Sequence, residues 1–139
     1  MKVLVDTSVW SLALRRRRPE ADGEVIAELG RLIAGFEVAM IGPIRQELLS
    51  GIREESQYLG LKDKLRAFPD MRLETTDYET AARFFNACRA RGVQGSNTDF
   101  LLCAAGFLRG MPIFTTDKDF DAYIRVLGIE LHRPRAFRK

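Results

Sequence analysis

Short apolar runs alternate along the chain with longer segments in which apolar residues recur every three or four positions. Runs without polar alternation are typical of strands that are buried on both faces of a parallel sheet. The longer segments have the period of amphipathic helices. Repeated alternation of strand and helix predicts a three-layer α/β/α sandwich around a central parallel sheet. The predicted strands are residues 3–5, 37–41, 71–73, 111–115 and 129–131.

Proline, glycine and aspartate residues indicate where the predicted helices begin and end. Pro19 and Pro43 suit the first position of a helix, and Gly35 suits the end of one. Asp77 is expected to cap the helix that follows it. Residues 98–109 are apolar on nearly every side, which predicts a central, buried helix. The predicted helices are residues 7–14, 19–35, 43–52, 54–68, 77–92, 98–109 and 120–127.

The composition is that of one globular domain. The chain has 139 residues, of which 46% are hydrophobic and 29% are charged, and neither a linker nor an internal repeat divides it. We therefore expect a single domain over residues 1–139, ending in a basic tail at 133–139. No apolar run approaches the roughly 20 residues that a membrane span needs. The first strand begins within a few residues of Met1, so no secretory leader is expected and the predicted location is cytoplasmic.

Charge and the less common residues narrow the chemistry. Lysine and arginine number 22 against 19 acids, an excess that favours a polyanionic partner. The run Arg15, Arg16, Arg17, Arg18 is either a solvated loop or an RNA contact. Cys88 and Cys103 lack metal-site spacing and are expected to be reduced and buried. His132 is the only histidine and lies near the C-terminus, which argues against a catalytic triad or a two-histidine ribonuclease.

Four acids are expected at one edge of the sheet. Asp6 and Asp117 follow predicted strands, whereas Glu47 and Asp99 lie near the starts of predicted helices. Ligands of open α/β sheets bind outside the carboxyl ends of the strands. Taken singly, Glu47, Asp99 and Asp117 are better explained as helix caps or surface residues, and Asp6 also could cap a helix. Together they form a set of hard oxygen ligands that suits Mg²⁺ or Mn²⁺, and such ions support phosphodiester hydrolysis.

The residues around these acids resemble the four motifs of PIN-domain ribonucleases, and within that family the VapC-like toxins of prokaryotic toxin–antitoxin pairs. The motifs are Val-Leu-Val-Asp-Thr-Ser from residue 3, Arg-Gln-Glu-Leu ending at residue 48, residues 99–105, and residues 115–120. The resemblance implies a PIN-like fold and an endoribonuclease that needs Mg²⁺ or Mn²⁺ and cuts tRNA, rRNA or mRNA, leaving a 5′-phosphate and a 3′-hydroxyl. Asp6, Glu47, Asp99 and Asp117 match the family's acidic positions. Thr7, Ser8, Thr116 and Asp119 match auxiliary ones.

The resemblance also implies partners. VapC-like toxins are neutralised by a small VapB-like antitoxin that covers the active site, and they form homodimers or larger assemblies with it. Trp10, Leu12 and Leu14 are either part of a groove for such a partner or part of the core. Two other functions remain open. One is a non-catalytic RNA-binding module of the same fold, and the other is a receiver-like signalling domain, although Asp6 lacks the adjacent acid that a receiver needs.

Overall fold

A three-stranded parallel sheet lies at the centre of the structure, a computed structural model that describes residues 1–14 and 22–135. The strands are β1 (Val3–Val5), β2 (Val38–Ala39) and β3 (Ile113–Phe114), in the order β2-β1-β3. Val3 pairs with Val38, and Leu4 pairs with Ile113. All of the residues in these strands are buried, as expected for a sheet covered on both faces.

Two of the predicted strands, 71–73 and 129–131, are replaced in the structure by single β-bridges at the edges of the sheet. Met40 pairs with Asp70, which lies one residue before the predicted strand 71–73, and Ile113 pairs with Leu131. At the first bridge the amide of Met71 donates to the carbonyl of Met40 at 2.7 Å, after which the chain leaves for the next helix. The predicted strands over residues 71–73 and 129–131 are therefore wrong as regular elements. The chain nevertheless runs parallel to the sheet at these two bridges.

Seven helices surround the sheet within the part of the chain that the structure describes. The helix start predicted at Pro19 lies outside the described residues, and the helix that the structure describes begins at Gly23, with Asp22 at its N-cap position. The third helix ends before Ile52, because Gly51 turns the chain with a positive φ of 86°. The last one is shorter than the predicted 120–127. The bounds are α1 (Thr7–Leu14), α2 (Gly23–Ala34), α3 (Gly42–Leu49), α4 (Glu55–Leu65), α5 (Thr75–Ala90), α6 (Asn97–Arg109) and α7 (Asp119–Tyr123).

The start of α5 differs from the sequence prediction. Glu74, and not Asp77, occupies the N-cap position, and Asp77 accepts a 2.7 Å hydrogen bond from the Glu74 amide. The other oxygen of Asp77 pairs with Arg109 at 2.5 Å, which joins the first turn of α5 to the end of α6. The Arg109 guanidinium holds the pKa of Asp77 below its ordinary value although the carboxylate is buried. Tyr78, in the first turn of this helix, is 55% exposed.

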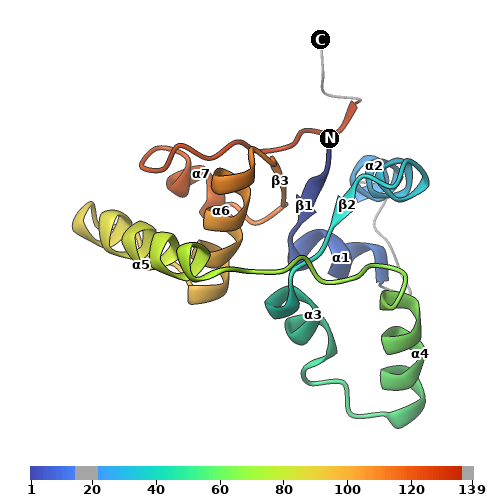
Figure 1. The fold of residues 1–139 in the computed structure, drawn as a ribbon. Helices are drawn as coiled ribbons and strands as arrows, with labels where there is room; N and C mark the ends of the chain where they lie inside the picture. Colours follow the sequence, from blue (N-terminus) through green and yellow to red (C-terminus); the bar gives the residue numbers. More distant parts are fainter. Residues whose placement is uncertain (15–21, 136–139) are drawn as a thin grey trace.

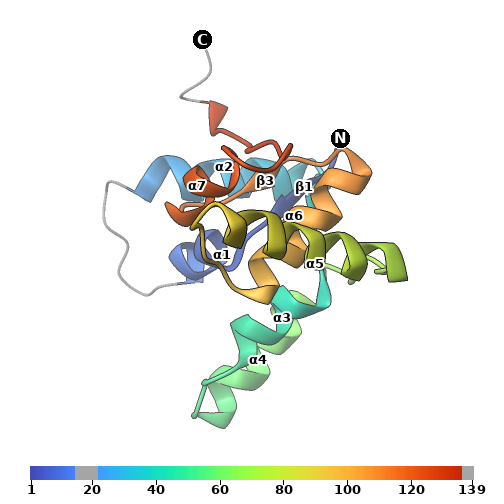
Figure 2. The same cartoon turned by 90° about the vertical axis from the view of Figure 1, so that its left-hand side faces the viewer.

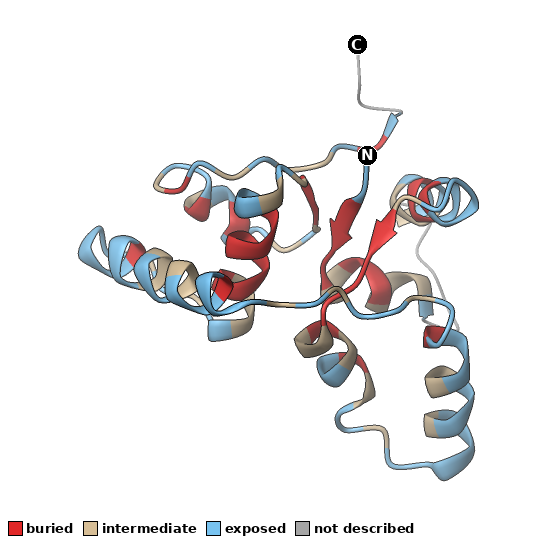
Figure 3. Ribbon diagram, viewed as in Figure 1, coloured by how far each residue is buried: buried red, intermediate tan, exposed pale blue. Residues whose placement is uncertain are grey.

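The helices form two layers around the sheet (Figure 1). In Figure 1 α5, α6 and α7 lie on one side of the strands and α1 and α2 lie on the other, and Figure 2 views the molecule from the side of α5. The most buried helix is α6, whose residues 100–106 are all buried, so the prediction of a central helix is confirmed (Figure 3). Cys88 and Cys103 are buried free thiols, as predicted. Among the described residues, no helix is long and apolar enough to cross a membrane.

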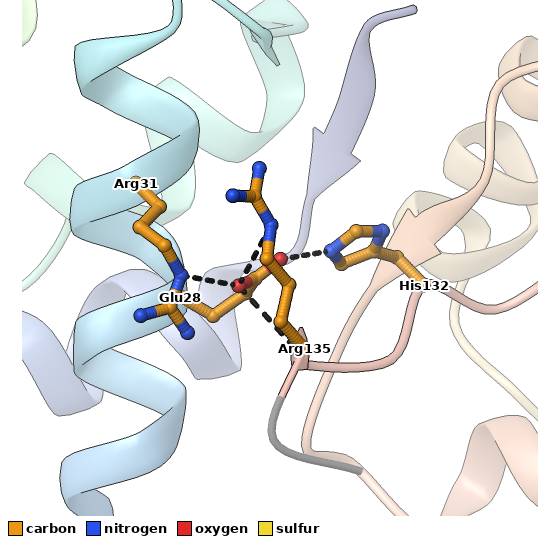
Figure 4. Close-up of polar contacts among 4 residues, drawn as sticks. All are labelled: Glu28, Arg31, His132 and Arg135. Atoms are coloured by element: carbon orange, nitrogen blue, oxygen red, sulfur yellow. Dashed lines mark hydrogen bonds and ion pairs between the residues drawn. The ribbon is translucent and has the colours of Figure 1, made fainter. Parts of the chain in front are cut away.

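The C-terminal segment is fastened to α2 by a buried carboxylate. Glu28 has no exposed surface, and its Oε2 lies 2.6 Å from Nε2 of His132 (Figure 4). Its Oε1 accepts from Nε of Arg31 at 3.0 Å and from the amide of Arg135 at 3.4 Å. Burial by itself raises the pKa of Glu28, but the hydrogen bonds from His132 and Arg31 outweigh it and the pKa is lowered. The single histidine thus has a structural partner.

Candidate functional site

Asp6 stands directly after β1 and is nearly buried, with 5% of its surface exposed. Its Oδ2 accepts hydrogen bonds from the hydroxyls of Ser8 and Thr115, each at 2.8 Å. Ser8 comes from the first turn of α1, and Thr115 directly follows β3. The main-chain carbonyl of Asp6 accepts a hydrogen bond from the amide of Val9, so the first turn of α1 is bonded to the backbone of Asp6. The hydroxyls of two neighbouring segments therefore fix the carboxylate of Asp6.

Glu47 reaches the same region from α3. This helix begins just after β2 with Pro43 in its first turn, as the sequence predicted. The hydroxyl of Thr7 donates to Oε1 of Glu47 at 2.7 Å. Because Thr7 is the residue after Asp6, this hydrogen bond joins the start of α1 to the middle of α3. The structure thus brings the first two predicted acids to one place.

Asp99 lies in the first turn of α6, where Ser96 caps the helix by accepting from the Asp99 amide at 3.1 Å. Oδ2 of Asp99 accepts a 2.7 Å hydrogen bond from the hydroxyl of Tyr123. Burial is the largest influence on this carboxyl and raises its pKa. The Tyr123 hydrogen bond acts in the opposite direction, but the negative charges of Asp6 and Asp117 raise the pKa further, and the net direction is upward. Asp99 is therefore close to both acids.

Asp117 lies in the connection between β3 and α7, and Asp119 is the first residue of α7. The amide of Asp117 donates to the hydroxyl of Thr115 at 3.0 Å, and the amide of Asp119 donates to Oδ1 of Asp117 at 2.9 Å. Carboxylate oxygens of Asp99, Asp117 and Asp119 all lie within 4.8 Å of one another. This spacing lets one divalent cation contact all three carboxylates.

Asp6, Glu47 and Asp99 line a cavity of about 520 Å³ at the carboxyl ends of the strands. Asp99 belongs both to the wall of this cavity and to the group with Asp117 and Asp119, so the five acids form one continuous acidic site. Carboxylates that crowd together repel each other unless a cation neutralises them. The donor set consists of hard oxygens, which fits Mg²⁺ or Mn²⁺. The cavity is lined by Asp6, Thr7, Pro43, Gln46, Glu47, Ser50, Thr98 and Asp99.

The structure adds two residues that the sequence interpretation did not single out for the site. Thr115 bonds Asp6 through its side chain, whereas Thr116 reaches the site with its backbone amide, which donates to Ser8 Oγ at 3.0 Å. Tyr123 bonds Asp99 from the far end of α7. Thr115 could have been predicted from the sequence, because it is a hydroxyl residue at the end of a predicted strand, at the edge where the acids were expected. Nothing in the local sequence pointed to Tyr123, because its partner lies 24 positions earlier.

Other predicted binding residues divide between the core and the surface. Trp10 is buried and packs edge-on against Phe68, with ring centroids 5.1 Å apart, so it belongs to the core. Leu14 is 40% exposed and lines a cavity of about 720 Å³ among α1, α3 and α4, which Glu47 also borders. The run Arg15 to Arg18 lies outside the described residues.

Comparison with known proteins finds relatives that match nearly the whole chain. The PIN domain family profile matches residues 3–125. The VapC ribonuclease Mb1587 of Mycobacterium bovis is 29% identical over 133 residues, which is 92% of this chain and 96% of the relative. Ribonuclease VapC11 of Mycobacterium tuberculosis matches to the same extent.

Solved structures share the fold. FitAcB from Neisseria gonorrhoeae superposes with a TM-score of 0.75 at 20% identity, covering 95% of this chain and 97% of that one. VapBC2 from Rickettsia felis, solved with a DNA fragment from its promoter, has a TM-score of 0.76 at 15% identity, covering 95% and 98%. The three-layer architecture that the sequence predicted is thus the PIN-like one. Since the family profile spans most of its length, the chain belongs to the PIN domain family.

Proposed function

We propose that this protein is a divalent-metal-dependent endoribonuclease and the toxin of a toxin–antitoxin pair. The observation that carries the proposal is the approach of Asp99, Asp117 and Asp119 to within 4.8 Å, beside a cavity that also exposes Asp6 and Glu47. The relatives that match over nearly the whole chain are named VapC ribonucleases. Membership of the PIN domain family and the acidic site both agree with phosphodiester hydrolysis.

In this proposal Asp6 and Asp99 are the central ligands of Mg²⁺ or Mn²⁺. Glu47 and Asp117 complete the set directly or through water, and Asp119 is close enough to join them. A bound ion supplies an activated water and neutralises charge on the phosphoryl group. Ser8 and Thr115 hold Asp6, Thr7 holds Glu47, and Tyr123 holds Asp99, so each of these three acids has a hydroxyl that orients it.

The single histidine is not the acid or base of the proposed reaction. His132 is the only histidine of the chain, and its side chain is 7% exposed and pairs with Glu28 on α2. The substrate we propose is RNA, with tRNA, rRNA or mRNA as the physiological target and a 5′-phosphate on the product. The basic run at residues 15–18 is the proposed contact for the phosphate backbone.

Cleavage of a small-RNA pool tests the enzyme. The purified chain is incubated with Mn²⁺ or with EDTA, beside Asp6→Asn and Asp99→Asn. Asp121→Asn is the matched control, because Asp121 is an exposed acid of α7 outside the acidic site. We expect fragments with 5′-phosphate that disappear with EDTA and in both site variants but persist in the control. RNA binding without cleavage in any sample would instead support a non-catalytic RNA-binding module.

The proposed protein partner is a small VapB-like antitoxin. Solved neighbours of this fold include a VapBC2 complex and FitAB bound to DNA. The cavity among α1, α3 and α4 lies beside Glu47, so an antitoxin segment seated there would reach the acidic site. We also propose a homodimer, or a larger assembly with antitoxin, in the cytoplasm.

Co-expression tests the partner. The small open reading frame next to the gene for this chain is expressed with it, and the pair is purified through a tag on the small protein. We expect growth arrest from the chain alone, relief by the pair, and a stable complex whose mass in light scattering exceeds one copy of each. Arrest that the neighbouring protein does not relieve would contradict the assignment of that partner.

A further inference from the structure

Tyr123 is a fully buried tyrosine whose hydroxyl reaches the acidic site. Its side chain has no exposed surface, yet its hydroxyl donates to Oδ2 of Asp99 at 2.7 Å. Phe120 and Phe100 pack against the ring, with centroid distances of 4.9 and 5.1 Å. A ring clamped between two others has little rotational freedom, so the place of its hydroxyl is fixed by packing.

Gly95 provides the space for this arrangement. A Cβ at residue 95 would lie 2.8 Å from Cζ of Tyr123 and closer still to the hydroxyl, and it would lie 3.0 Å from the ring of Phe100. The backbone of Gly95 is outside the left-handed region, so alanine is compatible with its conformation. The glycine is therefore required by the approach of Tyr123 and not by a turn.

The short helix α7 links this contact to the rest of the acidic site. Asp119 begins α7 and Tyr123 ends it, so one turn of helix carries an acid of the cluster and the hydroxyl that holds Asp99. The connection before α7 also carries Asp117. This segment thus carries two of the three clustered carboxylates and also the hydroxyl that bonds the third, Asp99 of α6.

We propose that Tyr123 is a positioning residue that orients the carboxylate of Asp99 for divalent cation binding, with Gly95 as the residue that makes room for it. The proposal rests on the proposed function, in which Asp99 is a metal ligand. By donating to Oδ2, the hydroxyl of Tyr123 restricts rotation of the Asp99 carboxylate and so fixes its plane. Hydrogen bonds of this kind to metal ligands typically change metal affinity by about 10–100-fold.

Mn²⁺ binding by calorimetry, without RNA, tests the proposal. Tyr123→Phe keeps the ring and removes the hydroxyl, and Tyr58→Phe on α4 is the matched control. We expect Mn²⁺ affinity to fall about 10-fold in Tyr123→Phe and to stay unchanged in the control. RNA cleavage by Tyr123→Phe should recover at high Mn²⁺. The variant should need more Mn²⁺ for half-maximal cleavage, whereas its cleavage rate at saturating Mn²⁺ should match that of the wild type. Gly95→Ala should weaken Mn²⁺ binding as well, although its tyrosine is intact.

Asp99→Asn separates failure of this proposal from failure of the proposed function. If Asp99→Asn loses Mn²⁺ affinity while Tyr123→Phe binds as the wild type does, the positioning role is wrong and the metal site stands. If neither variant changes the affinity, the metal site is wrong and the positioning role falls with it. A drop in thermal midpoint with unchanged Mn²⁺ affinity would make Tyr123 a purely structural residue.

Discussion

The hydroxyl of Thr7 donates a 2.7 Å hydrogen bond to Glu47, which lies 40 positions later in the chain. Thr7 belongs to α1 and Glu47 to α3, so this contact joins two helices that follow different strands of the sheet. The two residues share one cavity with Asp6. The hydrogen bond therefore fixes Glu47 relative to the acid at the end of β1.

Removal of this hydroxyl should affect activity more than stability. In Thr7→Val, Glu47 loses its donor while the shape of the side chain is kept, and we expect Mn²⁺-dependent cleavage to fall by about 10-fold. The bond is exposed, so the free energy of unfolding should change by less than about 1 kcal/mol. Thr7→Ser keeps a hydroxyl and should retain most activity. Equal activity in the valine and serine variants would contradict a positioning role for Thr7.

Two adjacent threonines should respond differently to the same change. Thr115 bonds Asp6 through its hydroxyl and accepts from the Asp117 amide, whereas Thr116 contacts Ser8 through its backbone amide. Thr115→Val should therefore reduce Mn²⁺ affinity and cleavage by about 10-fold or more. Thr116→Val keeps its backbone contact and should change little. The comparison is made by calorimetry and by cleavage rates, and a larger loss in Thr116→Val would contradict the contact assignment.

The ion pair between the buried Asp77 and the partly exposed Arg109 should be important for stability. Arg109→Met leaves Asp77, which is 1% exposed, without its guanidinium, and loss of one partner of a buried pair costs about 3–5 kcal/mol. Arg72→Met is the matched control, because Arg72 and Glu74 form an exposed pair worth less than about 1 kcal/mol. Urea unfolding measures both variants. Similar losses in the two variants would show that burial of the pair has no special effect.

The buried carboxylate of Glu28 should make stability depend on pH in acid. The folded protein holds the pKa of Glu28 below the ordinary value of 4.5, so the ionised carboxylate stabilises the fold. That contribution is complete above pH 4.5 and is lost as the pH falls through the lower, folded value. Asp77 changes in the same direction. Unfolding free energies should therefore decline as the solution is acidified below about pH 4.5.

Glu28→Gln separates this effect from general acid unfolding. The variant should be less stable than the wild type at neutral pH and should show a flatter decline in acid. Glu24→Gln, on an exposed position of the same helix, should follow the wild-type curve. A parallel decline in all three proteins, measured by urea unfolding across the pH series, would assign the acid sensitivity to other carboxyls.

The apolar pattern predicted most of the architecture because burial has a clear signature in sequence. The continuous run at residues 3–5 is the central strand, and the segment apolar on all sides is the buried helix α6. The edge of the sheet was harder, since single bridges at Asp70 and Leu131 need only one aligned residue and leave no periodic trace. The start of α5 was also mistaken, because Glu74 and Asp77 are both acids that suit the first turn.

The sequence by itself determined which acids meet, because residues that follow parallel strands arrive at the same edge of the sheet. Asp6 and Asp117 were found in this way, whereas Glu47 and Asp99 were found from their places near the starts of helices. Only the tertiary structure decided how they are held. Thr115 and Tyr123 act on partners 109 and 24 positions away, and such contacts depend on register and on the packing of α7 against α6. Hydrogen bonds between distant segments have no period along the chain, so local sequence does not encode them.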